Sequence, residues 1–123
     1  MRNRLGDPMK LPNGDQGTID VAGKLGGYCL NAEHARGRHK ARVFEATLGI
    51  TATDSERLVE ALQDAAANGD AIFRKTNEYG DEYMIEFVME ADERSFVVTS
   101  SWFLDKGKGI PRLTNCYVNL KKS

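Results

Sequence analysis

The chain has 123 residues, of which 41% are hydrophobic and 28% are charged, and its formal net charge at pH 7 is −1. This length fits one compact domain with a core large enough to fold without a metal or a disulfide. No apolar run approaches the roughly 18 residues of a membrane-spanning helix, and the N-terminus lacks the apolar stretch of a signal peptide, so we expect no contact with a membrane.

The first 17 residues are interrupted by residues that favour turns, namely Pro8, Pro12, Gly14 and Gly17. Proline and glycine at this density disfavour regular structure, and Asn13-Gly14 is typical of a turn. We therefore expect a flexible N-terminal segment over residues 1–17, which ends in an ordered loop. A single domain is expected to follow over residues 18–123.

Three helices are predicted in the first part of this domain. The first covers residues 20–30 and is weakened by three glycines, so it depends on packing. The second covers residues 37–48, where apolar side chains recur at helical spacing and Gly49 is a natural terminator. The third begins after a T-x-x-E capping box at Thr53 and extends to about residue 67.

After Gly69 the period of the apolar residues changes from helical spacing to alternation. The alternating segments predict four strands, at residues 71–75, 82–90, 95–104 and 110–120. Short polar linkers between them are typical of hairpins. Helices followed by a run of strands predict an α+β fold, with about three N-terminal helices and a four-stranded antiparallel β-meander.

The last predicted strand carries two polar residues of interest, Thr114 and Tyr117. If this strand is regular, Thr114 lies on the same face as Cys116 and Val118, and Tyr117 lies on the opposite face. A bulge would change that assignment. Threonine and tyrosine are also good strand formers, so both residues are open to a purely structural interpretation.

Charge is distributed unevenly along the chain. Residues 54–93 contain twelve Asp/Glu and three Lys/Arg, a balance of −9, whereas the remainder has a balance of +8. If the basic front and the basic tail meet in space, they form a positive face that attracts a polyanion. The alternative is that solvated charges of both signs alternate around the surface.

The two cysteines, Cys29 and Cys116, are far apart in the sequence and form no C-x-x-C motif. We expect reduced thiols and a cytoplasmic location, either in the producing cell or in a target cell after delivery. Two histidines and two separated cysteines offer few ligands for a metal, and no cofactor motif is present. We therefore expect neither a metal nor a cofactor.

Residues 31–44 concentrate most of the side chains suited to acid–base or phosphate chemistry. His34 precedes the second helix and is a candidate general acid or base, because imidazole titrates near neutral pH. It is equally consistent with a loop cap. Lys40 is a candidate for stabilising phosphate charge, or a lysine whose stem covers apolar surface. The candidate phosphate contacts, or a solvated helix face, are Arg36, Arg38, His39 and Arg42.

The chain contains four motifs in a characteristic order: K-L-x-x-Y-C-L-N-x-E-H-x-x-G-x-H-K-A-R-V-F-x-x-x-L-G, then E-Y-G-x-x-Y, S-x-W and P-R-L-T-x-C-Y. Together, over residues 11–118, they resemble an uncharacterised bacterial domain family. That family is found at the C-termini of large adhesin- and haemagglutinin-like proteins or as small free-standing proteins. It is in turn similar to the barnase/EndoU/colicin/RelE superfold of ribonucleases, many of which are toxins.

The resemblance implies a metal-independent endoribonuclease, in which the ribose 2′-OH attacks the adjacent phosphate. His34 is then the acid or base and Lys40 the electrostatic stabiliser of the phosphorane. Arg112 binds phosphate, and Thr114 and Tyr117 position the scissile group. The implied partners are RNA and a cognate inhibitor protein.

The resemblance does not imply a catalytic role for every basic residue. His39 lies at a position that varies in the family, so it is expected to support RNA binding rather than catalysis. A different class of function stays open: a non-catalytic module of a bacterial toxin or phage-related system, which docks a protein through the acidic middle of the chain. Convergence of His34, Lys40 and Thr114 or Tyr117 in one cleft favours the enzyme.

Overall fold

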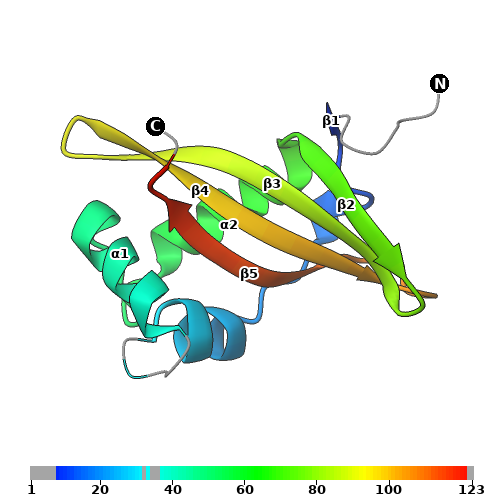
Figure 1. Ribbon diagram of the computed structural model, residues 1–123, viewed down its shortest axis with the longest axis horizontal. Coiled ribbons are helices and arrows are strands. Elements are labelled where there is room, and N and C mark those ends of the chain that lie inside the picture. Colours follow the sequence, from blue (N-terminus) through cyan, green and yellow to red (C-terminus); the bar gives the residue numbers. More distant parts are fainter. Residues whose placement is uncertain (1–7, 32, 34–36, 122–123) are drawn as a thin grey trace.

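The computed structural model describes residues 8–31, 33 and 37–121. A short strand and two short helical segments come first, two α-helices follow, and four longer strands complete the chain (Figure 1). In order, the elements are β1 (Pro8–Met9), η1 (Gly14–Gln16), η2 (Val21–Cys29), α1 (Arg38–Leu48), α2 (Glu56–Asn68), β2 (Ala71–Asn77), β3 (Gly80–Ala91), β4 (Arg94–Asp105) and β5 (Arg112–Asn119).

The strands form one antiparallel sheet in the order β1-β2-β3-β4-β5. The predicted α+β fold, with helices before a four-stranded antiparallel meander, is confirmed by β2 to β5. The sheet gains one short strand that was not predicted, because Pro8 and Met9 pair with Ile72 and Ala71 at the edge of β2. In Figure 1, α2 lies across one face of the sheet, and α1 and η2 lie beside β5.

The described part of the segment predicted as a flexible N-terminus, residues 8–17, contains positions that pack against the domain. Residues 1–7 lie outside the described residues. Leu11 is buried, and Gly14 lies so close to α2 that a Cβ there would overlap the carbonyl oxygen of Ala66. The backbone N–H of Gly17 donates to the carbonyl of Gly14 at 3.0 Å. The packed domain therefore starts before residue 18.

The first predicted helix forms, but as a π-helix. The N–H of Leu25 donates to the carbonyl of Asp20 at 3.1 Å, and the N–H of Leu30 donates to the carbonyl of Leu25 at 2.7 Å. Gly23 and Gly26 explain the difference, because glycine gives little preference for the tighter α-helical spacing. The Asp20 carboxylate accepts from the N–H of Gly23 at 2.9 Å and holds the first turn.

The second predicted helix is confirmed, and the third has a different start. Gly49 ends α1 with a φ of +69°, a left-handed conformation that favours glycine. The capping box predicted at Thr53 is wrong, since α2 begins two residues later with Ser55 as its cap residue. The Thr53 hydroxyl instead lies 3.2 Å from that of Thr51, within the preceding turn.

The core lies between the helices and one face of the sheet. Large side chains from α1, α2, β3 and β4 are buried there, namely Phe44, Leu58, Leu62, Ile85, Val98 and Trp102, and Phe87 is partly buried. Within this core, the Trp102 indole donates to the Ser100 hydroxyl at 2.9 Å, which in turn donates to the Ile85 carbonyl at 2.8 Å. These two hydrogen bonds satisfy polar atoms that would otherwise be costly to bury.

A β-bulge in β5 changes which side chains share a face. Ser101 of β4 pairs with Asn115, but Trp102 pairs with Leu113, so Thr114 is an additional residue on β5. Leu113 and Cys116 therefore both point into the core, and Val118 follows Cys116. The bulge therefore removes Thr114 from the face that a regular strand would have given it, whereas Tyr117 does lie opposite Cys116 and Val118.

Replacing a core leucine tests this packing against an exposed leucine of the same chain. Leu62 is fully buried and Leu120 is 62% exposed. We expect Leu62→Ala to lower the free energy of unfolding by about 2–5 kcal/mol, through lost burial and an unfilled cavity. Leu120→Ala should change it by less than about 0.5 kcal/mol. Urea denaturation followed by circular dichroism measures both, and equal effects would contradict the described core.

Candidate functional site

A cavity of about 390 Å³ lies between α1 and the C-terminal end of β5. This volume is within the usual range for small-molecule sites. Three of the predicted site residues line it, since His39 and Lys40 come from α1 and Tyr117 comes from β5. The remaining lining residues are Val43, Val118, Asn119, Leu120 and Lys121.

Lys40 is held in this cavity by the packing of α1. It precedes Phe44 by four residues, so the two side chains lie on the same side of the helix. Phe44 is fully buried and Lys40 is half-buried, which places the lysine stem along the core and its ammonium group at the edge of the sheet. The ammonium donates to Oδ1 of Asn115 at 3.1 Å and lies 5.6 Å from the centre of the Tyr117 ring.

Tyr117 belongs to a row of polar residues across three strands. It pairs with Thr99 of β4, which pairs with Glu86 of β3. The Thr99 hydroxyl donates to Oε2 of Glu86 at 3.1 Å. By alternation this row lies on the face opposite to Val98 and the core. Sequence analysis missed Glu86 and Thr99 because alternation assigns a face, whereas only the register of three strands brings them into line with Tyr117.

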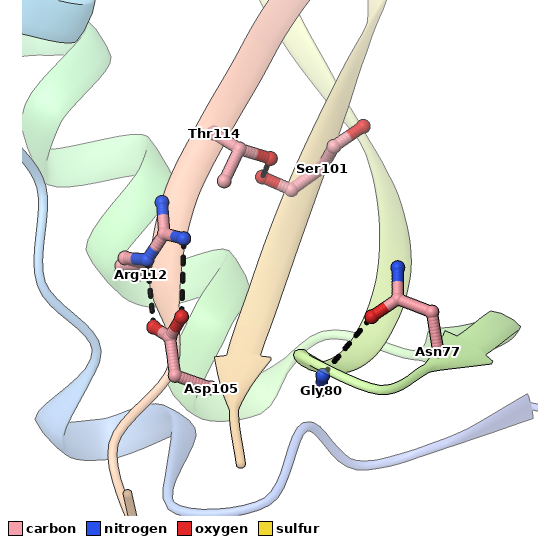
Figure 2. A network of polar contacts seen from close by, with 6 residues as sticks. All are labelled: Asn77, Gly80, Ser101, Asp105, Arg112 and Thr114. Atoms are coloured by element: carbon pink, nitrogen blue, oxygen red, sulfur yellow. Dashed lines mark hydrogen bonds and ion pairs between the residues drawn. The ribbon is translucent and has the colours of Figure 1, made fainter.

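Arg112 lies at the other end of β5 and forms an ion pair there (Figure 2). Its Nε donates to Oδ2 of Asp105 at 2.7 Å and its Nη2 to Oδ1 at 3.2 Å. This hydrogen bonding raises the pKa of Arg112 and lowers that of Asp105. Five residues of strand separate Arg112 from Tyr117, roughly 16 Å at the usual rise. A phosphate bound by Arg112 would compete with Asp105 and would lie well away from Lys40.

Thr114 lies at the bulge rather than in the cavity. Its hydroxyl donates to the backbone carbonyl of Ser101 at 3.2 Å (Figure 2). The side chain is half-buried, and this hydrogen bond ties the extra residue of β5 to β4. The structure therefore gives Thr114 a role in shaping the strand that carries Tyr117.

The other basic candidates divide between the surface of α1 and the segment before it. Arg38 and Arg42 are both exposed and lie four residues apart, on one side of the helix. His39 is exposed as well, but it lines the cavity beside Lys40. His34 and Arg36 lie outside the described residues.

Within the described part of the chain, every helix is too short or too polar to cross a membrane. Among the same residues, no three His, Cys, Asp or Glu side chains come together as potential metal ligands.

Neutralising Asp105 tests the ion pair at the far end of β5. The pKa of Asp105 is lowered by Arg112, so the pair contributes stability above the ordinary aspartate pKa of about 3.9, and that contribution is lost as the pH falls through the folded-state pKa. Asp105→Asn should therefore lower the melting temperature slightly at about pH 7 and leave it unchanged at strongly acidic pH. Thermal melts of both proteins across this range measure the difference, and a difference independent of pH would contradict the pairing.

The chain matches a family described as a domain of unknown function (DUF6883) over residues 10–120. No curated protein and no solved structure gives a significant match. The similarity to ribonuclease toxins and to adhesin C-termini therefore stays a prediction. Because the match covers nearly all of the described fold, from η1 to β5, the chain belongs to the DUF6883 family.

Proposed function

We propose that the chain is a metal-independent endoribonuclease whose scissile phosphate binds in the cavity between α1 and β5. The observation that carries this proposal is the convergence of an imidazole, an ammonium and a phenol, from His39, Lys40 and Tyr117, around one opening of about 390 Å³. These groups come from elements more than 70 residues apart, and together they offer proton transfer, positive charge and a hydrogen-bond donor.

In the proposed reaction, the ribose 2′-oxygen attacks the adjacent phosphorus and the bond to the 5′-oxygen breaks. A general base takes the 2′ proton and a general acid protonates the leaving oxygen. The products are a 2′,3′-cyclic phosphate and a 5′-hydroxyl. Lys40 stabilises the negative charge of the phosphorane, and the Tyr117 hydroxyl donates to a phosphate oxygen. His39 was expected only to support RNA binding, but it lines the cavity beside Lys40 and, together with His34, transfers the protons.

The remaining candidates take supporting roles in this proposal. Thr114 maintains the bulge that directs Tyr117 towards α1. Arg38 and Arg42 are exposed on α1 and contact phosphates that flank the cleaved one. Arg112 contacts RNA further along the strand, once its carboxylate partner has been displaced.

Single-stranded RNA fits this cavity better than a duplex. The volume is suited to one nucleotide, and bases become accessible only when they are unstacked and unpaired. Val43 and Leu120 supply apolar surface for the base, while Lys121 adds a second cation for the phosphates. The ribonuclease-toxin resemblance adds that the RNA is met in the cytoplasm, of the producing cell or of a target cell, and that a cognate inhibitor protein blocks the site.

The alternative of a non-catalytic protein-binding module has less support in the described residues. A docking surface usually gathers exposed apolar side chains into one patch. The large apolar side chains that are exposed here belong to five separate places in the fold, in η2, the β2–β3 turn, β3, the loop before β5 and the end of β5. They are Val21, Tyr79, Val88, Ile110 and Leu120.

Cleavage of RNA by cavity variants tests the proposal directly. Purified protein is incubated with single-stranded RNA and a chelator, and the fragments are examined for 2′,3′-cyclic phosphate ends. We expect Lys40→Met to reduce the rate by about 100-fold or more, because charge on the phosphorane is left uncompensated. His39→Ala and His34→Ala should each reduce it by about 100-fold or more if the residue transfers a proton.

Matched variants outside the cavity control for general effects on charge and folding. Tyr79 and Lys75 are exposed at the far end of the sheet, in the β2–β3 hairpin. Tyr117→Phe should slow cleavage while Tyr79→Phe leaves it unchanged, and Lys75→Met should behave as the unmodified protein does. Absence of cleavage by the unmodified protein, or full activity of Lys40→Met, would reject the mechanism.

Binding can be separated from cleavage with a 2′-deoxy oligonucleotide, which lacks the attacking hydroxyl. Each phosphate contact contributes about 0.7 to the slope of log K against log salt concentration for a single strand. Lys40→Met and Lys121→Met should each reduce the slope by about that amount, and Arg38→Gln should weaken binding similarly. Fluorescence anisotropy at several salt concentrations measures the slope. A slope that is the same in all variants would place the nucleic acid elsewhere.

A further inference from the structure

Phe103 and Arg112 contact each other on the face of the sheet that points away from the core. Phe103 of β4 is paired directly with Arg112 of β5, so the two side chains lie on the same face. The central guanidinium carbon of Arg112 lies 5.3 Å from the centre of the Phe103 ring, within the range of a cation–π contact. Phe103 is half-buried, and 47% of the Arg112 side-chain surface is exposed. A ligand can therefore reach this pair from solvent.

Each member of the pair is held in place by a second contact. A Cβ added at Gly80 would lie 2.8 Å from Cε2 of Phe103, so the ring packs closely against the glycine backbone. The Asp105 carboxylate accepts from Nε and Nη2 of Arg112 (Figure 2). Both of these N–H groups lie in the plane of the guanidinium, so Asp105 occupies its edge and not its flat faces. A phosphate reaches that edge only by displacing Asp105, whereas a flat base can reach a face while the ion pair is intact.

We propose that Phe103 and Arg112 form a stacking platform for an unpaired base of the bound RNA strand. Bases of single-stranded RNA stack on aromatic rings and on the planes of arginine guanidinium groups, and this pair offers both. The positive charge of Arg112 also attracts the phosphates next to the stacked base. The inference rests on the proposed function for the presence of RNA, and it adds a second contact site outside the α1–β5 cavity.

The platform and the cavity lie on the same face of the sheet. The pairing of β4 with β3 is uninterrupted, so Thr99, Ser101 and Phe103 all point to this face. Thr99 is paired with Tyr117 of the cavity, and Phe103 is paired with Arg112. Thr99 and Phe103 are four residues apart, roughly 13 Å along a regular strand. At a stacked spacing of about 3.4 Å, the base on the platform is at most about four nucleotides from the cleaved phosphate.

A second arginine–phenylalanine contact in the chain provides a matched control. The central guanidinium carbon of Arg94 lies 5.2 Å from the centre of the Phe96 ring. Phe96 is buried and alternates along β4 with the same period as the core residue Val98. This pair therefore lies on the opposite face of the sheet from Tyr117. Replacing Arg94 removes the same kind of contact without changing the face on which the RNA is proposed to bind.

Binding of a strand that the chain cannot cleave tests the platform. A 2′-deoxy oligonucleotide with about five nucleotides on either side of a central one is compared with the same strand in which the flanking sugars carry no bases. The number of phosphates is then equal in the two strands. Because one stacked base contributes at least about fivefold in affinity, we expect the complete strand to bind at least that much more tightly in fluorescence anisotropy. Equal affinities would overturn the proposal.

Three variants assign this difference to the platform. Phe103→Leu removes the ring, and Arg112→Lys keeps the positive charge but removes the guanidinium plane. Both should reduce the difference between the two strands by about fivefold or more, whereas Arg94→Lys should retain it. A difference retained in full by the first two variants, or lost equally in Arg94→Lys, would contradict the platform.

Cleavage of a DNA strand that contains one ribonucleotide fixes the position of the stacked base, because only that nucleotide carries the attacking 2′-hydroxyl. Bases are then removed from the strand one position at a time. Removal of the stacked base, within about four nucleotides on one side of the ribonucleotide, should raise KM by about fivefold or more. It should leave kcat unchanged, since the contact is remote from the reacting atoms. In Phe103→Leu the same removal should leave KM unchanged. A KM that is insensitive at every position in the unmodified chain would refute the platform.

The two kinds of measurement separate the platform from the proposed function. If binding depends on the flanking bases through Phe103 and Arg112 but no RNA is cleaved, the endoribonuclease proposal fails and the platform stands. If RNA is cleaved and the flanking bases change neither affinity nor KM, the platform fails and the endoribonuclease stands. The comparison of the two strands on the unmodified chain decides the proposal even where a variant does not fold.

Discussion

Between Ser101 and Trp102, β4 is paired with one more residue of β5 than regular pairing requires, and that residue is Thr114. The extra residue allows Leu113 and Cys116 to face the core together, although they are three positions apart. Beyond the bulge, Tyr117 returns to the face away from the core. The hydrogen bond from the Thr114 hydroxyl to the Ser101 carbonyl holds this arrangement. The cavity at α1 depends on it.

The cavity also depends on a charged group, the ammonium of Lys40, which is held against β5. Burying part of a lysine is costly unless the ammonium group finds compensation. Here the helix is fixed by Phe44 and Leu48 in the core, and the ammonium of Lys40 is met by the Asn115 amide and the Tyr117 ring. The same amide is an acceptor for Cys29. One side chain of β5 therefore connects the proposed phosphate site with the buried end of η2.

The distribution of charge in the sequence is a poor guide to the distribution in space. Arg112 belongs to the basic part of the chain, yet it is paired with Asp105 of the same part and lies at the opposite end of β5 from Lys40. Glu86 belongs to the acidic part, yet it lies in the row that leads to Tyr117. Sheet pairing sorts residues by register rather than by their segment of origin, so the positions of these charges do not follow the blocks seen in the sequence.

The elements themselves were predictable from sequence, because helical spacing and alternation are local patterns imposed by backbone geometry. The change of period at Gly69 was enough to predict two regular helices, four strands and an antiparallel meander. Local patterns also chose Lys40 and Tyr117 as candidates. Local patterns gave wrong predictions at two places. Glycines allowed a π-helix in η2, and α2 has Ser55 as its cap residue instead of the predicted capping box at Thr53.

What only the tertiary structure decided is which candidates meet. The distance between Lys40 and Tyr117 and the separation of Arg112 from both follow from long-range packing and from a single inserted residue in β5. A bulge leaves almost no trace in a sequence of good strand formers, since either register satisfies the local preferences. The sequence by itself determined the chemistry available to this protein, and the fold determined which of those groups act together.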